Sequence, residues 1–178
     1  MNKGNSNMNW DEWYDPTSKI HYELSKHLLL TTKQILDEHN IPFLLVFGTL
    51  LGAYRDKSFI PHDTDVDVAL FYEDIQKVKS LIDSGKFMDY GIECIRDSVP
   101  YIYSLRYKED YIDLYFFQKT KKQYRCGQYE LQNEQVAKPF AKIEFLGSSF
   151  TTVHNIENYL TSKYGDWKTV RMNKHAKH

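Results

Sequence analysis

Two aspartates in the first half of the chain have the spacing of paired metal ligands. Asp65 and Asp67 fall on a predicted strand, residues 65–71, that begins by alternating aspartate with valine. Because successive side chains of a strand point to opposite faces, both carboxylates emerge on the same face. Two carboxylates at this spacing repel each other unless a cation neutralises them. Since both ligands offer only oxygen, the pair favours Mg²⁺, or Mn²⁺ in its place, over zinc.

A third aspartate, Asp113, interrupts a second predicted strand, residues 111–117, that is otherwise aromatic and aliphatic. An isolated carboxylate in such surroundings is costly unless it is paired or bound to a metal. Either a bound metal or a buried ion pair with Arg106 or Lys108 would stabilise Asp113 there. If this strand lies beside residues 65–71, the three carboxylates converge on one site.

Two other interpretations of the aspartate pair have to be weighed. The first is an ordinary solvated strand face. The second is a calcium loop of the EF-hand type, because Asp63, Asp65 and Asp67 stand at its first, third and fifth positions. That loop needs glycine at the sixth position and glutamate at the twelfth. Here these positions hold Val68 and Asp74, which argues against the calcium loop.

A possible phosphate site precedes the aspartates. The predicted strand 43–47 ends at Gly48 and Thr49, and residues 50–55 look like a helical turn. A strand followed by glycine, a hydroxyl residue and the start of a helix directs free backbone N–H groups toward one point, where a phosphate can bind. The alternative is an ordinary connection between a strand and a helix. Arg55 is a candidate phosphate clamp, with a surface ion pair to Asp56 or Asp63 as its alternative.

The elements that must position these residues follow from hydrophobic periodicity. Helical spacing covers residues 17–39 and 72–83, and a last helix, 155–164, ends at Gly165. Strands are expected at 43–47, 65–71, 87–95, 100–107, 111–117 and, more weakly, 141–146, with a polar hairpin at 118–127. This order predicts one α+β (α/β) domain, a mixed β-sheet flanked by helices, over residues 17–170. Residues 1–16 and 171–178 are expected to be tails.

Composition narrows the class of protein. The chain has 178 residues and a formal net charge of -1, so it lacks the basic footprint of a nucleic-acid binder. The longest mostly apolar stretch, residues 41–54, is shorter than the roughly 20 residues of a membrane span. The polar start has no apolar region typical of a secretory signal. Two cysteines are too few for a disulfide scaffold, so we expect a cytoplasmic protein without a transmembrane segment.

Three blocks of the sequence resemble the LicD family, which includes fukutin and fukutin-related protein. FGTLLGAYRDKSFIPHDTDVDVAL (47–70) is similar to the family's signature, YIDLYFF (111–117) to a strand that carries an aspartate, and FLGSSFTTVHNIENYLTSKYGDW (145–167) to its closing pattern. The chain departs from the pattern at His62, where the family has tryptophan, at Thr64, where it has aspartate, and at His154, where proline is frequent.

The resemblance implies a nucleotidyltransferase-like fold and an enzyme that moves a phospho-alcohol from a CDP-linked donor to a glycan hydroxyl. The phospho-alcohol would be phosphocholine, phosphoethanolamine or ribitol phosphate. Asp65 and Asp67 would hold Mg²⁺, and Asp113 would complete the metal shell and orient or deprotonate the attacking hydroxyl. The substrate-binding residues expected on this basis are Gly48, Thr49, Arg55, His62 and Asp63.

Two other functions use the same residues. In one, the protein transfers a nucleotide from an NTP to a small hydroxylated acceptor and releases pyrophosphate. In the other, it is a non-catalytic module that binds a nucleotide or a glycan. Retention of three mutually repelling carboxylates argues against the second. Tyr164 and Trp167 either stack on a base or sugar or pack the last helix onto the core.

Overall fold

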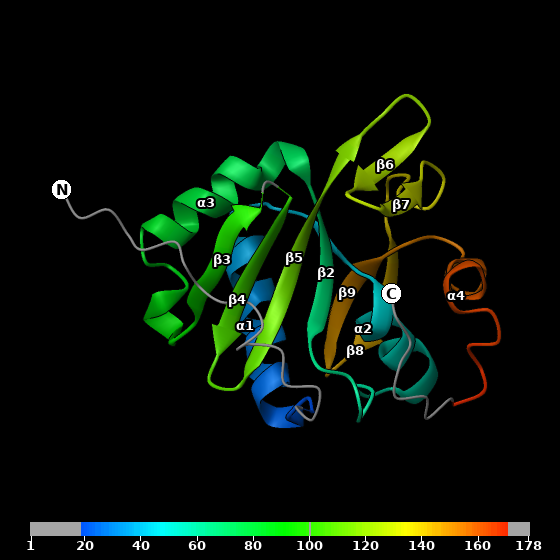
Figure 1. The fold of residues 1–178 in the computed structure, drawn as a ribbon, viewed down its shortest axis with the longest axis horizontal. Coiled ribbons are helices and arrows are strands. Elements are labelled where there is room, and N and C mark those ends of the chain that lie inside the picture. Colours follow the sequence, from blue (N-terminus) through cyan, green and yellow to red (C-terminus); the bar gives the residue numbers. More distant parts are fainter. Residues whose placement is uncertain (1–18, 100, 171–178) are drawn as a thin grey trace.

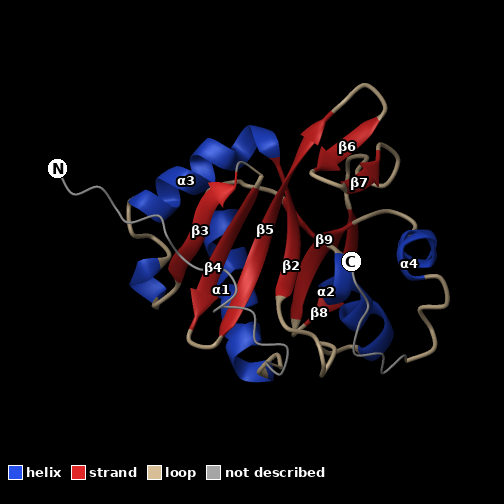
Figure 2. Ribbon diagram, viewed as in Figure 1, coloured by secondary structure: helices blue, strands red, loops and turns tan. Residues whose placement is uncertain are grey.

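The computed structural model describes residues 19–99 and 101–170, which form a nine-stranded mixed sheet with helices packed on it (Figures 1 and 2). The main path of the sheet runs β3-β4-β5-β2-β1-β9-β8, and β6 and β7 extend from β5. The strands are β1 (Phe43–Leu45), β2 (Val66–Phe71), β3 (Glu93–Val99), β4 (Ile102–Tyr107), β5 (Asp110–Lys119), β6 (Gln123–Cys126), β7 (Tyr129–Gln132), β8 (Ala141–Phe145) and β9 (Ser148–Thr152). The helices are α1 (Tyr22–Glu38), α2 (Phe47–Leu51), α3 (Ile75–Asp83) and α4 (Ile156–Tyr164).

The centre of the sheet is the parallel pair of β2 and β5. Every residue of β2 is buried, and Val66 pairs with Ile112 while Asp67 pairs with Asp113. β1 joins β2 on its other side in antiparallel register, so the short strand 43–45 is buried as well. The predicted adjacency of the strands around 65–71 and 111–117 is confirmed.

The helix α1 packs on the face of the sheet that is turned away from the viewer in Figure 1, against β4 and β5. Its N-terminus is tied to the start of β5 by one buried carboxylate. Asp110 Oδ2 accepts hydrogen bonds from the His21 backbone N–H at 2.9 Å and from Ser25 Oγ at 2.5 Å, and Oδ1 lies 2.8 Å from His21 Nδ1. Asp110 stands three residues before Asp113, so this contact also fixes the strand that carries the third carboxylate.

Several helices and strands begin or end at other residues than the sequence predicted. The strand 43–47 ends at Leu45, and Phe47 begins α2 with a φ of 51°, so Gly48 and Thr49 lie inside the helix. The expected turn 50–55 is the end of α2 and a π-helical turn, η2 (Gly52–Asp56). The helix 72–83 begins as a 3₁₀ turn, Tyr72–Asp74. Around 87–95, a 3₁₀ turn at Met88–Tyr90 precedes β3, which begins only at Glu93.

The strand β9 was not predicted. It forms a hairpin with β8 around Leu146 and Gly147, which have φ values of 53° and 76°. Two successive residues with positive φ are the usual turn of a two-residue hairpin. Gly147 indicates a turn in the sequence, but the two serines that follow it are not typical of a strand, so the second strand of the hairpin was not recognised. The last helix and its end at Gly165, where φ is 66°, are confirmed to within one residue.

The expected tails, 1–16 and 171–178, lie outside the described residues, and the domain limits 17–170 stay a prediction. The helix expected from residue 17 begins at Tyr22 in the described part. Of the helices in residues 19–99 and 101–170, none combines the length and apolar character that a bilayer span requires.

The Asp110 contact predicts a measurable loss of stability on Asp110→Asn. An amide cannot accept from all the donors that meet this carboxylate, and hydrogen bonds to a buried charged group contribute about 1.5–3 kcal/mol each. We expect the free energy of unfolding, measured with urea, to fall by about 2 kcal/mol. The hydrogen bond to Asp110, and then its charge, raise the pKa of His21. The His21 contribution is therefore present below pH 6.5 and is lost as pH rises through the raised pKa.

The matched control is Asp37→Asn, which removes an exposed i,i+4 ion pair with Lys33 on the same helix. Such pairs contribute a few tenths of a kcal/mol, so its urea midpoint should stay close to that of the unsubstituted protein. An Asp110→Asn midpoint equal to that of Asp37→Asn would show that α1 is not anchored in this way.

Candidate active site

Three carboxylates meet on one face of the two central strands. Asp67 in β2 stands directly opposite Asp113 in β5, and Asp65 immediately precedes β2. Neighbouring strands lie about 4.8 Å apart, so side chains in register on the same face are close neighbours. Asp67 and Asp113 are 8% and 6% exposed. The structure therefore brings Asp65, Asp67 and Asp113 together, as the sequence predicted.

A fourth carboxylate, Asp63, lies against the first turn of α2. A Cβ atom built on Gly48 would collide with Asp63 Oδ2, so a larger residue here would displace this carboxylate. Asp63 also accepts a hydrogen bond from the Thr64 backbone N–H at 3.2 Å. The structure thus gives Gly48 a steric role beside the carboxylates, and its predicted contact with phosphate stays a prediction.

Thr49 supports the central carboxylate through the backbone. Its Oγ1 accepts a hydrogen bond from the Asp67 N–H at 2.8 Å, and the residue is 2% exposed. This hydrogen bond joins the first turn of α2 to β2 at Asp67, one of the candidate metal ligands. Thr49 is therefore a positioning residue for Asp67, and its role as a phosphate ligand stays a prediction.

Burial, together with mutual repulsion in the case of Asp65 and Asp67, raises the pKa values of these carboxyl groups. Burial, followed by the charges of Asp63 and Asp113, raises the pKa of Asp65 to about 7. Burial and the charge of Asp65 raise the pKa of Asp67 well above its ordinary value. The pKa of Asp113 is also raised by burial, although Arg96 opposes the shift. A cation placed among these groups would replace the shared protons.

The donor set fits a hard divalent cation that keeps water or substrate oxygens in its shell. All the candidate ligands are carboxylates, the type that Mg²⁺ and Mn²⁺ prefer. Within residues 19–99 and 101–170, no three His, Cys, Asp or Glu side chains form a ready-made metal cage. Mg²⁺ is commonly held by one or two carboxylates plus substrate phosphates, which is what Asp65 and Asp67 can offer.

Asp113 has an ion-pair partner that sequence reasoning missed. Arg96 Nη2 donates to both oxygens of Asp113, at 3.0 and 2.9 Å, and Arg96 Nε donates to Ser104 Oγ at 2.9 Å. The Ser104 hydroxyl in turn donates to Asp113. The alternative considered from the sequence was an ion pair with Arg106 or Lys108.

The ion pair weighed as an alternative named other partners, because strand register selects the arginine that reaches Asp113. Arg96, Ser104 and Asp113 are in register across β3, β4 and β5, and the small serine lets the arginine reach over it. Arg106 instead pairs with Glu93 at 2.7 Å. The alignment of Arg96, Ser104 and Asp113 depends on the order and register of three strands, which the sequence alone does not give. The expected role of Asp113 as a third metal ligand stays a prediction.

Arg55 is committed to contacts within the chain. Its Nε and Nη2 donate to Asp56 at 2.8 and 2.7 Å, and its Nη1 donates to the Trp167 carbonyl at 3.0 Å. This is the surface ion pair weighed as its alternative. His62 is exposed in the loop before β2. The roles of both residues in substrate binding stay predictions.

Trp167 is packed rather than presented to solvent. It is 7% exposed, its ring centroid lies 5.6 Å from that of Tyr54, and its Nε1 donates to Thr161 at 3.1 Å. These contacts secure the segment after α4 against η2, as expected from the packing interpretation of the sequence.

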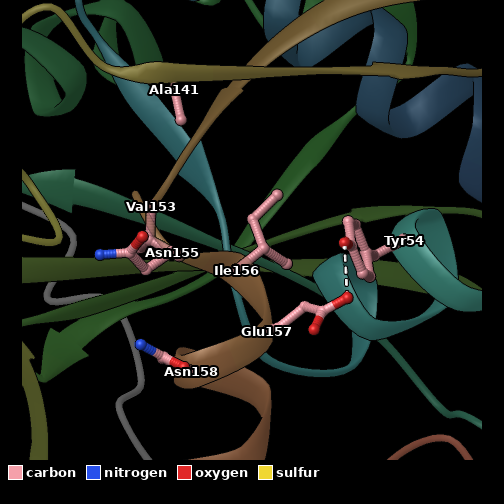
Figure 3. Close-up of a pocket in the computed structure, with 7 residues that line it drawn as sticks. All are labelled: Tyr54, Ala141, Val153, Asn155, Ile156, Glu157 and Asn158. Carbon is pink, nitrogen blue, oxygen red and sulfur yellow. Dashed lines mark hydrogen bonds between the residues drawn. The ribbon is translucent and has the colours of Figure 1, made fainter.

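A pocket of about 330 Å³ lies between η2 and the start of α4 (Figure 3). Across it, the Tyr54 hydroxyl donates to Glu157 at 3.2 Å, and the side chains of Asn155 and Asn158 stand at its rim. A second pocket, of about 480 Å³, is lined by residues that include Tyr72, Tyr101 and Phe116. The aspartates of the site line neither of these two pockets.

Comparison with known sequences identifies proteins similar to this chain. The profile of the family described as "LicD/FKTN/FKRP, nucleotidyltransferase domain" matches residues 40–155. The chain is 27% identical over 154 residues to the ribitol-5-phosphate transferase FKTN of Homo sapiens, and equally to that of Macaca fascicularis. Each alignment covers 81% of this chain and 33% of the relative. The chain therefore spans about a third of the length of these curated relatives.

Solved structures share the fold. ANT(2")-Ia in complex with adenylyl-2"-tobramycin superposes with a TM-score of 0.53 at 14% identity, over 72% of this chain and 68% of that one. The lincosamide antibiotic adenylyltransferase LnuA, with lincomycin bound, superposes with a TM-score of 0.52 at 16% identity, over 73% and 80%. At such low identity the likeness concerns the fold alone. It confirms the predicted nucleotidyltransferase-like mixed sheet flanked by helices.

The raised carboxyl pKa values predict that Asp65→Asn stabilises the protein at pH 8. A group whose folded-state pKa is raised contributes stability while protonated and loses it as pH rises through that pKa, here about 7. The asparagine stays neutral throughout. Relief of even one pKa unit corresponds to about 1.4 kcal/mol, a rise in Tm of about 3–6 °C at this size. Thermal unfolding should show a larger rise at pH 8 than at pH 5, because the contribution of protonated Asp65 is complete only below its ordinary pKa of 3.8 and is lost as pH rises to about 7.

Added Mg²⁺ should raise the Tm of the unsubstituted protein at pH 8 and have little effect on Asp65→Asn. The exposed Asp89→Asn serves as the control, with a Tm and a Mg²⁺ response equal to those of the unsubstituted protein. A fall in Tm at pH 8 on Asp65→Asn would mean that the carboxylates do not strain the fold.

Proposed function

The chain belongs to the LicD/FKTN/FKRP nucleotidyltransferase-domain family, and from this premise we propose that it is a transferase that moves a phospho-alcohol from a CDP-linked donor to a hydroxyl group of a glycan. The observation that carries the proposal is the register of β2 and β5, which sets Asp67 opposite Asp113 with Asp65 beside them. Ribitol phosphate is the favoured group, because the two curated relatives named above are described as ribitol-5-phosphate transferases.

In this reaction the glycan oxygen attacks the phosphorus that carries the alcohol. A new oxygen–phosphorus bond forms, the bond to the bridging oxygen of the diphosphate breaks, and CMP leaves. Asp65 and Asp67 would hold Mg²⁺, which would supply positive charge to neutralise the diphosphate and the leaving group. Thr49 would keep Asp67 in place for this task through its bond to the Asp67 N–H.

Asp113 would orient the attacking hydroxyl and accept its proton. A general base must lie within hydrogen-bond reach of the proton and be ionised. Arg96 favours the ionised form of Asp113 against the effect of burial, and it also holds the carboxylate in one orientation together with Ser104. The Arg96 guanidinium is thus the group that keeps Asp113 usable as a base in a buried site.

A second candidate reaction uses the same carboxylates. In nucleotidyl transfer, the acceptor hydroxyl attacks the α-phosphorus of an NTP and pyrophosphate leaves. The likeness of the fold to ANT(2")-Ia and to the adenylyltransferase LnuA is the observation that favours it. The product that leaves, CMP or pyrophosphate, separates the two reactions. A non-catalytic binding module would release neither.

The test is to incubate the protein with Mg²⁺ and, in parallel, CDP-ribitol, CDP-choline or ATP, and to identify the product. We expect CMP from a CDP-linked donor, slowly by hydrolysis when no acceptor is present. Asp67→Asn should lower the rate by about 10²–10³-fold, as loss of one preorganised electrostatic group does. Asp89→Asn should leave it unchanged.

Chelation with EDTA should abolish CMP release, and Mg²⁺ or Mn²⁺ should restore it. Release of pyrophosphate from ATP with no CMP from any CDP-alcohol would replace the proposed reaction with nucleotidyl transfer. Full activity of Asp67→Asn would reject the assignment of the site.

A further inference from the structure

The last turn of α4 carries a lysine that the proposed chemistry has not used. Lys163 is half-buried, and its Nζ lies 4.2 Å from the centroid of the Phe47 ring and 5.1 Å from that of the Tyr129 ring. Burial lowers the pKa of Lys163, whereas the charge of Asp67 raises it. The ammonium group thus stands in the field of the carboxylate site.

This ammonium group has no carboxylate bound to it in the part of the chain that the structure describes. The lysines that form ion pairs there are Lys33, Lys77 and Lys79. Aromatic faces attract a cation but accept no strong hydrogen bond from it, so they hold the ammonium in place and leave its donors available. A half-buried cation held in this way is suited to receive an anion.

Phe47, whose ring contacts the Lys163 ammonium group, has an unusual backbone conformation. Phe47 has a φ of 51°, a conformation that is rare and costly for a residue with a bulky side chain. The resulting orientation places its ring 5.2 Å from that of Tyr115, which stands two residues after Asp113 on β5. The Phe47 backbone N–H donates to the Tyr159 hydroxyl of α4 at 3.2 Å. Lys163 is therefore connected to the carboxylate strands through one strained residue.

A second group on the same turn lacks a partner. The Tyr164 hydroxyl is buried and has no hydrogen-bond partner among the described residues. An unsatisfied buried hydroxyl costs stability and calls for an explanation, such as a ligand. The charges of Asp67, Asp63 and Asp65 act on it, which places this hydroxyl near the carboxylates as well.

We propose that Lys163 and the Tyr164 hydroxyl form an anion-binding position for the diphosphate of the donor, near the aspartates that would bind the metal. This inference rests on the proposed function for the identity of the donor. A diphosphate approaching four carboxylates is repelled, so it needs positive charge on its free side as well as at the metal. Lysine is a common phosphate ligand because its compact charge reaches oxygens in several directions.

The decisive variant is Lys163→Gln, with Lys163→Arg as the conservative replacement and Lys168→Gln as the control. Lys168 is exposed, and its Nζ likewise lies over an aromatic ring, 5.3 Å from the centroid of Trp167. Calorimetric titrations with CDP and with pyrophosphate, both in Mg²⁺, measure diphosphate binding without turnover, and cytidine reports on the base and sugar alone. Thermal unfolding verifies that each variant is folded.

We expect Lys163→Gln to weaken the binding of CDP and of pyrophosphate by about 10- to 100-fold, with cytidine unaffected, because a hydrogen bond to a charged group is lost. Lys163→Arg should recover part of the affinity, and Lys168→Gln should bind as the unsubstituted protein does. Tyr164→Phe should weaken pyrophosphate by about 3- to 10-fold without lowering the Tm.

Unchanged affinity of a folded Lys163→Gln for both diphosphates would overturn the proposal, whatever the activity of the unsubstituted protein. Loss of pyrophosphate binding in Lys163→Gln would uphold it, even if the unsubstituted protein released no CMP from any CDP-alcohol. In that case the anion position would stand and the proposed donor would be wrong.

Discussion

The parallel pairing of β2 with β5 is the constraint on which the rest of the site depends. It sets Asp67 beside Asp113, and no local preference of either strand could do so. Two contacts keep the pair in place: Thr49 bonds the backbone of Asp67, and Asp110 ties the start of β5 to α1. A shift of one residue in this register would turn one of the two carboxylates to the opposite face and leave the site without its third group.

The carboxyl groups of the site repel one another, and the rest of the fold must offset this repulsion. The carboxyl groups are buried near one another, and their raised pKa values follow from this position. Arg96 balances Asp113 in the described structure, while Asp65 and Asp67 have no comparable ion pair with an arginine or lysine there. The difference separates a carboxylate that has an arginine partner in the protein from two carboxylates suited to a divalent cation.

The sequence was sufficient for the parts of the site that depend on local spacing, and insufficient where strand register decides. The two-residue spacing of Asp65 and Asp67 placed them on one face, and the isolated Asp113 suggested the third position. The partner of Asp113 could not be predicted, because Arg96 reaches it only across a third strand. The strained start of α2 at Phe47 was also missed, since strand-like residues continue to that point.

The most direct measurement of the central claim is the anomalous diffraction of Mn²⁺ in crystals of the protein grown at pH 8 with CDP. The cluster predicts an anomalous peak between the carboxylates of Asp65 and Asp67, with diphosphate oxygens completing the coordination shell. The peak should be lost in Asp67→Asn crystals grown in the same way. A Mn²⁺ peak elsewhere on the molecule, with these two carboxylates free of metal, would contradict the claim that the two strands build a metal-dependent transferase site.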